Sequence, residues 1–272
     1  MVFVFDVDGT LLDDDERLPQ ENKEAVLRAS ERNVVILASG RMLKSVLRFS
    51  QEKFGKIFPT IAYNGGMVFI PNEGVIYESK IPPKTAFGVI RSLRKMKVHR
   101  QAYINDELIS EEDNEEVKSY AKHSGVEYSI VDDLAEVVSK HGATKVLAIA
   151  SSQVLDHVKV ELSPKFPSLR IFKSFSTYLD FVPKDVGKYK ALVFLSNVMG
   201  FSIEDVVAFG DNDNDADIIE SSGLGIAMGN ATQRVKEVAD FVAPSNNEAG
   251  VAKIVNRILN GSFHLSNSLE GN

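Results

Sequence analysis

Two groups of aspartates at the ends of apolar segments are the residues of this sequence best suited to chemistry. Asp6 and Asp8 end the apolar run that starts at Val2, and Gly9 follows them. One carboxylate of such a pair can attack an electrophile while the other transfers protons. The glycine permits a tight turn whose amides can face a phosphate. If this pair stood alone, a polar turn after a buried strand would be the better explanation.

A second acidic segment favours a chemical role for Asp6 and Asp8 over a simple polar turn. It follows the strand-like segment 205–209, which is apolar from Val206 on, and contains Asp211 and Asp215. If both apolar segments are neighbouring parallel strands, these two carboxylates converge with Asp6 and Asp8 at one edge of a sheet. Such a concentration of negative charge requires a cation, and oxygen ligands without histidine or cysteine suit Mg²⁺.

Three other ligand-binding motifs resemble parts of the sequence but fail at defining positions. The acidic segment mimics the start of an EF-hand loop, but Ala216 stands where that loop needs Gly, and Ser222 where it needs Glu. A glycine-rich stretch has Met228 in place of the third Gly of GxGxxG. Gly187 and Lys188 lack the other residues of a P-loop.

The elements that must position the acidic groups follow an alternating α/β pattern. Continuous apolar runs predict strands covered on both faces, as in a parallel sheet. Ser39 and Gly40 follow one of these runs, at the end where ligands bind in doubly wound folds. Strands are predicted at residues 2–5, 34–38, 60–63, 205–209 and 225–228, and helices at residues 19–32, 188–198 and 217–221.

The α/β pattern is interrupted between Pro82 and Pro183. The intervening segment reads helix, strands, helix, helix, strand, helix and strands, which predicts a separate α+β domain. The predicted architecture is therefore a Rossmann-like core of residues 1–81 and 184–272 with an inserted domain of residues 82–183.

Five polar residues of the predicted insertion are candidates for selecting a substrate, although ordinary exposed sheet positions would explain them equally well. His99, Gln101 and Tyr103 alternate on one predicted face, and Tyr178 and Asp180 on another.

Composition narrows the class of protein. The formal net charge of −7 argues against a broad nucleic-acid or anionic-membrane surface. The sequence has no cysteine, no apolar run long enough to span a bilayer and no secretory leader pattern, so a cytoplasmic protein is expected. A monomer is expected because an enclosed site needs no partner subunit. Residues 261–272 are rich in Ser, Asn and Gly and are expected to fray.

The chain resembles phosphatases of the haloacid dehalogenase superfamily, of the Cof-type group (class IIB) with a large α/β cap. Four separated motifs carry the resemblance: Asp6-Val7-Asp8-Gly9-Thr10 (DxDGT), Ser39-Gly40-Arg41, Lys188, and Gly210-Asp211-x-x-Asn214-Asp215 (GDxxND). Three further stretches are typical of the group: Asn64-Gly65, residues 227–231 and residues 246–251.

The resemblance implies a role for each aspartate. Asp6 would be the nucleophile and form an aspartyl-phosphate, and Asp8 would protonate the leaving alcohol and then help activate water. Mg²⁺ would bind the Asp6 carboxylate, the Asp8 backbone carbonyl and Asp211, with Asp215 supporting it through water. The ion would let an anionic carboxylate approach an anionic phosphoryl group.

The resemblance also implies a phosphate-binding set. Ser39, the backbone at Gly40, Lys188 and Asn214 would hold the phosphate oxygens. An alternative role for Ser39, compatible with the first, is the N-cap of the following helix.

The third motif departs from the family pattern, which commonly reads Lys-Gly-x-Ala. Tyr189 replaces the glycine here. Lys188 keeps the expected distance before Ala191, and Lys190 is the alternative phosphate-binding lysine.

The predicted function is hydrolysis of small phosphate esters, with sugar phosphates the leading class. Relatives that store the aspartyl-phosphate, such as ion-pumping ATPases, carry Thr where this chain has Asp8, so hydrolysis or mutase chemistry is favoured. A phosphomutase is one alternative, and an idle regulatory or binding protein on the same scaffold is another.

Overall fold

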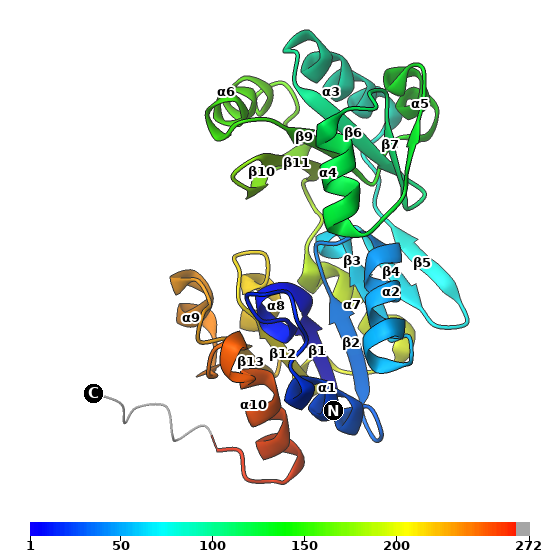
Figure 1. Cartoon of the computed structure of the whole chain (residues 1–272). Coiled ribbons are helices and arrows are strands. Elements are labelled where there is room, and N and C mark those ends of the chain that lie inside the picture. Colours follow the sequence, from blue (N-terminus) through cyan, green and yellow to red (C-terminus); the bar gives the residue numbers. More distant parts are fainter. Residues whose placement is uncertain (265–272) are drawn as a thin grey trace. The chain divides into compact units, whose positions relative to one another are not determined.

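The structure, a computed structural model, describes residues 1–264 and divides into two compact units (Figure 1). The first contains residues 1–40, residues 46–76 and the chain from Gly187 onward. The second contains residues 41–45 and 77–186, so its main segment begins at residue 77 rather than 82 and ends at 186 rather than 183. The predicted fraying of the tail lies outside the described residues from residue 265 on.

The first unit is built on an eight-stranded sheet, counted over residues 1–264, in which six neighbouring strands run parallel. The strand β4 is antiparallel to β3. The strand β1, apolar up to its last residue Asp6, is buried along its whole length because strands flank it on both edges and helices cover the sheet. The spatial order is β14 (Phe241–Val242), β13 (Leu224–Ala227), β12 (Val206–Gly210), β1 (Val2–Asp6), β2 (Val34–Ala38), β3 (Thr60–Ala62), β4 (Met67–Ile70) and β5 (Gly74–Glu78).

The helices of this unit bury apolar side chains. The predicted face of α1, with Ala25, Val26 and Ala29, is buried, and this helix contacts β2 and α10. These helices and the parallel strands confirm the predicted doubly wound α/β fold. The helices are α1 (Gln20–Ala29), α2 (Leu43–Phe54, whose first three residues belong to the second unit), α7 (Lys188–Met199), α8 (Ala216–Ser221), α9 (Gln233–Val238) and α10 (Gly250–Leu259).

The second unit is an α+β domain with one six-stranded sheet among its described residues. One side of this sheet forms an apolar cluster with three helices, to which Ala102, Val146 and Phe181 contribute. The strand order is β10 (Leu169–Phe175), β11 (Tyr178–Pro183), β9 (Lys145–Ile149), β6 (His99–Ile104), β7 (Glu107–Ser110) and β8 (Tyr128–Ile130). The helices are α3 (Pro83–Lys95), α4 (Glu115–Ser124), α5 (Leu134–His141) and α6 (Ser152–Leu162).

The five polar candidate residues lie on the other side of this sheet. The prediction that they occupy two different faces is wrong, because all five share one face. His99 and Tyr178 both lie opposite Ile149, and Gln101 and Asp180 both lie opposite Leu147. Residues directly opposite one another in antiparallel strands point to the same side.

The same residues are not ordinary exposed positions either. Gln101 and Tyr103 are fully buried, His99 and Asp180 are nearly so, and Tyr178 is partly buried. The ring of Tyr120, from α4, lies 6.1 Å from that of Tyr103 and 5.5 Å from that of Tyr178. The helix α4 therefore covers this polar face.

Two further details of the second unit differ from the sequence-based expectation. The short strand β8 lies between α4 and α5, where no strand was predicted, because its half-exposed Tyr-Ser-Ile run lacks a clear apolar pattern. Residues 41–45 join the unit because the Asp106 carboxylate accepts the backbone N–H groups of Leu43, at 3.0 Å, and Lys44, at 2.7 Å. That pairing spans more than sixty residues of sequence.

The turn after β3 depends on a close approach that only glycine permits. Gly65 has φ +99°, and a Cβ there would overlap the backbone carbonyl oxygen of Gly187 at the start of α7. Gly74 also has a positive φ, +85°, but has no atom within contact distance of an added Cβ.

We expect Gly65→Ala to lower the free energy of unfolding by about 2 kcal/mol or more, because backbone strain and steric overlap add. Gly74→Ala, which suffers strain alone, should cost about 1 kcal/mol. Urea unfolding of the two variants and the wild type measures both values. Equal losses would contradict the close contact between Gly65 and Gly187.

Candidate functional site

The predicted site residues come together because three neighbouring strands end at the same level. In the register of the sheet, Asp6 at the end of β1 aligns with Ala38 at the end of β2. On the other side, Phe5 aligns with Phe209, so Asp211 follows the end of β12. The carboxyl ends of parallel strands thus bring together residues that are about two hundred positions apart in the chain.

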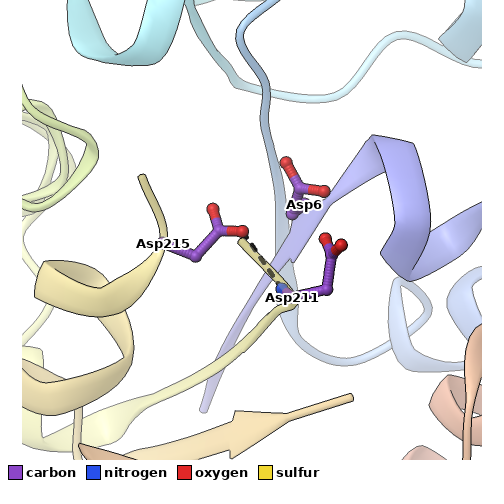
Figure 2. A group of neighbouring side chains, drawn as sticks. All are labelled: Asp6, Asp211 and Asp215. Atoms are coloured by element: carbon purple, nitrogen blue, oxygen red, sulfur yellow. Dashed lines mark hydrogen bonds between the residues drawn. The ribbon is translucent and has the colours of Figure 1, made fainter. Parts of the chain in front are cut away.

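Three carboxylates form a cluster at this edge. Asp6, Asp211 and Asp215 each place a carboxylate oxygen within 4.8 Å of the others (Figure 2). Asp6 is 6% exposed and Asp215 1%. Burial raises the pKa of Asp6 well above its usual value, although the Lys188 ammonium opposes the change. Burial, and then the charge of Asp215, raises the pKa of Asp211 to about 7.

One buried lysine lies between two of these carboxylates. Lys188 is fully buried, and its Nζ donates to Asp6 Oδ1 at 2.6 Å and to Asp215 Oδ1 at 2.5 Å. Burial alone would lower the pKa of Lys188, but the two carboxylates outweigh it and raise the pKa. Lys190, the alternative from the sequence, is exposed. The geometry therefore places Lys188, and not Lys190, in the carboxylate cluster.

The position at which the helix α7 begins explains how the Lys188 side chain comes to be fully buried. Lys188 is the first residue of α7, and Gly187 before it is in extended conformation. A Cβ on Gly187 would approach Asp217 Oδ2 to 2.9 Å. The glycine thus lets α7 begin close to α8, which follows Asp215.

The turn after β1 sets the direction of Asp8. Residues 7–11 form a tight turn in which Gly9 has φ +79°, and a Cβ on Gly9 would overlap the Asp211 carboxylate. Thr10 Oγ1 donates to Asp211 Oδ1 at 3.1 Å. Asp8 is exposed, and its charge contributes to the raised pKa values of Asp6 and Asp211.

The second acidic segment is held by its own backbone. Asp215 Oδ2 accepts the backbone N–H of Asp211 at 3.1 Å (Figure 2). The same oxygen accepts the backbone N–H of Asn212, also at 3.1 Å. A Cβ on Gly210 would meet the Asp215 side chain at 2.5 Å. The GDxxND spacing therefore lets the Asp215 carboxylate bond the backbone of the turn that carries Asp211.

Three of the four predicted phosphate-binding residues, all but Lys188, lie against Asn64. The backbone N–H of Asn64 donates to the Ser39 carbonyl at 2.9 Å, and its Oδ1 accepts from Asn214 Nδ2 at 2.9 Å. Gly40 is packed so that a Cβ would lie 3.1 Å from the Asn64 amide. Asn64 has φ +55°, as does its neighbour Tyr63 with +53°, and such strained backbone is concentrated at functional sites.

The alternative role of Ser39 as a helix N-cap is wrong. The helix α2 begins at Leu43, four residues later. Its first N–H groups are accepted by Asp106, as described above. Ser39 is instead fully buried, and its backbone N–H donates to the Ile61 carbonyl at 2.8 Å.

Charge balance tests whether the predicted metal fits these residues. Three clustered carboxylates face one ammonium group, which leaves a formal charge of −2 when all are ionised (1 − 3 = −2). Burial is the main cause of the raised pKa values of Asp6 and Asp211, and the neighbouring carboxylates raise them further. A divalent cation with a preference for oxygen ligands would neutralise it, so the donor set fits Mg²⁺.

Sequence reasoning did not assign a role to two residues that the geometry places in the site. Thr10 bonds the Asp211 carboxylate, and Asn64 links Ser39 to Asn214. Both belonged to recognised motifs, DxDGT and Asn64-Gly65, so a signal was present. Their contacts were not predictable because each partner lies far away in the sequence.

Known proteins resemble the chain over nearly its whole length. The haloacid dehalogenase-like hydrolase family matches residues 3–255. The crystal structure of TM0651 from Thermotoga maritima has a TM-score of 0.89 at 48% identity, covering 94% of this chain and 96% of that one. The subclass IIB sugar phosphatase BT4131 has a TM-score of 0.80 at 25% identity, covering 96% and 99%. The Bacillus subtilis 5-amino-6-(5-phospho-D-ribitylamino)uracil phosphatase YwtE is 27% identical, covering 95% and 98%.

We expect Lys188→Met to lower the free energy of unfolding by about 3 kcal/mol or more in EDTA, since it leaves two buried carboxylates without their cation. Lys190→Met changes an exposed residue of the same helix and should stay within about 0.5 kcal/mol of the wild type. Urea unfolding without metal compares them. A larger loss for Lys190→Met would refute the assignment of the buried lysine.

Proposed function

The chain belongs to the haloacid dehalogenase-like hydrolase family, and from that membership we propose that it is a Mg²⁺-dependent phosphatase of small phosphorylated metabolites. Its class, a Cof-type phosphoric monoester hydrolase, is confirmed by the comparisons. The observation that carries the finer proposal is the cluster of Asp6, Asp211 and Asp215, two of which, Asp6 and Asp215, are bonded by Lys188.

In the proposed first step, a carboxylate oxygen of Asp6 attacks phosphorus. The bond between phosphorus and the ester oxygen breaks, and Asp8 gives its proton to the departing alcohol. Lys188 fixes the Asp6 carboxylate by its 2.6 Å hydrogen bond, so that the nucleophile is oriented before substrate arrives. The product of this step is an aspartyl-phosphate on Asp6.

In the proposed second step, Asp8 takes a proton from water, which attacks the phosphorus of the aspartyl-phosphate. Phosphate leaves and the Asp6 carboxylate is restored. Mg²⁺, held by the Asp6 carboxylate, the Asp8 carbonyl, Asp211 and Asp215, would supply neutralisation of the phosphoryl charge. Ser39, Gly40, Lys188 and Asn214 are the proposed phosphate contacts. A common link to Asn64 supports three of them, Ser39, Gly40 and Asn214.

Sugar phosphates, or phosphate esters of related polyols, are the proposed substrate class. Two relatives support it: BT4131 is named a sugar phosphatase, and the substrate named for YwtE carries its phosphate on a ribityl chain. We propose that the second unit, residues 77–186, acts as the cap that selects the leaving group. A phosphomutase is the alternative, and it would form an isomer without free phosphate.

Other features of the sequence-based prediction stay predictions: a monomer, a cytoplasmic location, and no nucleic-acid or membrane partner. For residues 1–264 the finding is limited to this: they include no helix with the length and apolarity needed to span a bilayer.

We expect phosphate release from a panel of sugar phosphates, nucleotides and p-nitrophenyl phosphate to require Mg²⁺ and to stop in EDTA. Asp6→Asn should lower the rate at least about 10³-fold because the nucleophile is lost. Release that persists in EDTA, or in metal-loaded Asp6→Asn, would contradict the proposal. No release with any compound by folded, metal-loaded protein would favour a mutase or an idle scaffold.

A further inference from the structure

A side chain outside the proposed catalytic set holds the backbone that carries Asp8. Asn230 Nδ2 donates to the Gly9 carbonyl oxygen at 2.8 Å. This carbonyl belongs to the peptide bond between Gly9 and Thr10, so it lies one residue after Asp8 and one before the threonine that bonds Asp211. None of the roles proposed above uses Asn230.

The Asn230 side chain is itself fixed from the other side. Its Oδ1 accepts the backbone N–H of Asn246 at 2.9 Å. Asn246 is fully buried, and its Nδ2 donates to the Leu12 carbonyl at 3.1 Å and to Asp14 Oδ1 at 3.0 Å. The amide of Asn230 therefore bridges two segments, and the second of them also holds the chain just after the Asp8 turn.

The loop that contains Asn230 is also tied to the second acidic segment. The backbone N–H of Met228 donates to the Gly210 carbonyl at 3.0 Å, and that of Thr232 to the Asp211 carbonyl at 2.8 Å. A displacement of Gly9 relative to Asp211 must therefore break or bend the Asn230 hydrogen bond. The Asn230 bridge keeps the Asp8 turn in register with the carboxylate cluster.

We propose that Asn230 is a positioning residue for Asp8, and that its bridge to the Gly9 carbonyl governs proton delivery to the leaving group. The exposed Asp8 carboxylate takes its direction from the turn of residues 7–11, in which Gly9 has a left-handed backbone. Glycine adopts positive and negative φ values about equally readily, so Gly9 does not hold the turn in one conformation by itself. This inference rests on the proposed role of Asp8 as the general acid. The inference concerns the transfer of a proton from Asp8 to the leaving alcohol, and not the attack of Asp6 on phosphorus.

Two aryl phosphates separate this role from a general structural one. p-Nitrophenyl phosphate and phenyl phosphate differ little in shape, but p-nitrophenolate leaves readily without a proton, whereas phenolate is much more basic. The kcat/KM value includes the steps up to release of the phenol and excludes later hydrolysis of the aspartyl-phosphate. The ratio of kcat/KM for p-nitrophenyl phosphate to that for phenyl phosphate therefore reports proton delivery.

We expect Asn230→Ala to raise that ratio about three- to tenfold above the wild-type ratio, the effect of one lost hydrogen bond. Asp8→Asn, which removes the acid, should raise it further. Asn247→Ala is the matched control: Asn247 is equally exposed and bonds Asp14, by Nδ2 to Oδ2 at 2.8 Å, without touching Gly9. Its ratio should stay within about twofold of the wild type.

The outcomes distinguish this inference from the proposed function. If Asp8→Asn raises the ratio but Asn230→Ala lowers both kcat/KM values equally, Asn230 is merely structural and the inference alone is wrong. If Asp8→Asn leaves the ratio unchanged, Asp8 is not the acid. The role proposed for Asp8 and the role inferred for Asn230 are then both overturned. Should Asn230→Ala fail to fold, Asn230→Asp retains the acceptor for Asn246, removes the donor to Gly9, and should raise the ratio likewise.

Discussion

The ammonium group of Lys188 lies between two buried carboxylates, and the architecture of the first unit depends on that contact. An isolated charge in such a place would cost several kcal/mol, and the cost is offset only when partners are held at hydrogen-bonding distance. Here Asp6 ends the central strand β1, Asp215 precedes α8, and Lys188 begins α7. Three separate elements must therefore end or begin at one point. The glycines at 65, 187 and 210 serve this requirement because each allows two segments to approach where a side chain would intervene.

The second unit handles buried charge in a related way. Lys145 Nζ donates to Asp180 Oδ1 at 2.8 Å and lies 4.6 Å from the centre of the Tyr103 ring. Burial alone would lower the pKa of Lys145, but the Asp180 carboxylate raises it. Gln101 Nε2 donates in turn to the Tyr103 hydroxyl at 2.8 Å. The polar residues on this side of the sheet thus bond one another beneath α4, with Asp180 Oδ2 the one oxygen of the Lys145–Asp180 pair left without a partner. These bonds explain how a face that looks hydrophilic in the sequence comes to be buried.

The parts predicted well from the sequence are those governed by local patterns. The strand β2, at Val34–Ala38, was predicted to the residue because a continuous apolar run between polar residues marks a buried parallel strand. The GDxxND spacing identified Asp211 and Asp215 because the turn that joins them is short and self-contained. The alternation of such segments was enough to predict the parallel sheet.

The parts predicted poorly depend on contacts between distant segments. The common face of Gln101 and Asp180 follows from the register of β6, β9 and β11, which no single strand encodes. The choice between Lys188 and Lys190 needed the starting point of α7 relative to the sheet. Asn230 gave no indication of its partner, because its hydrogen bond to the Gly9 carbonyl crosses 221 positions.

The central position of β1 in the sheet has a consequence for folding during translation. This strand is synthesised long before β12, with which it pairs on one side, and the chain just after its turn is bonded by a side chain as distant as Asn246. A nascent chain can form β1 with β2 early, but one edge of that pair stays open until β12 has been made. Catalytic competence should thus arrive in one late event during translation, however early Asp6 leaves the exit tunnel. Until then, the open edge of β1 is a template on which strands of other chains can pair.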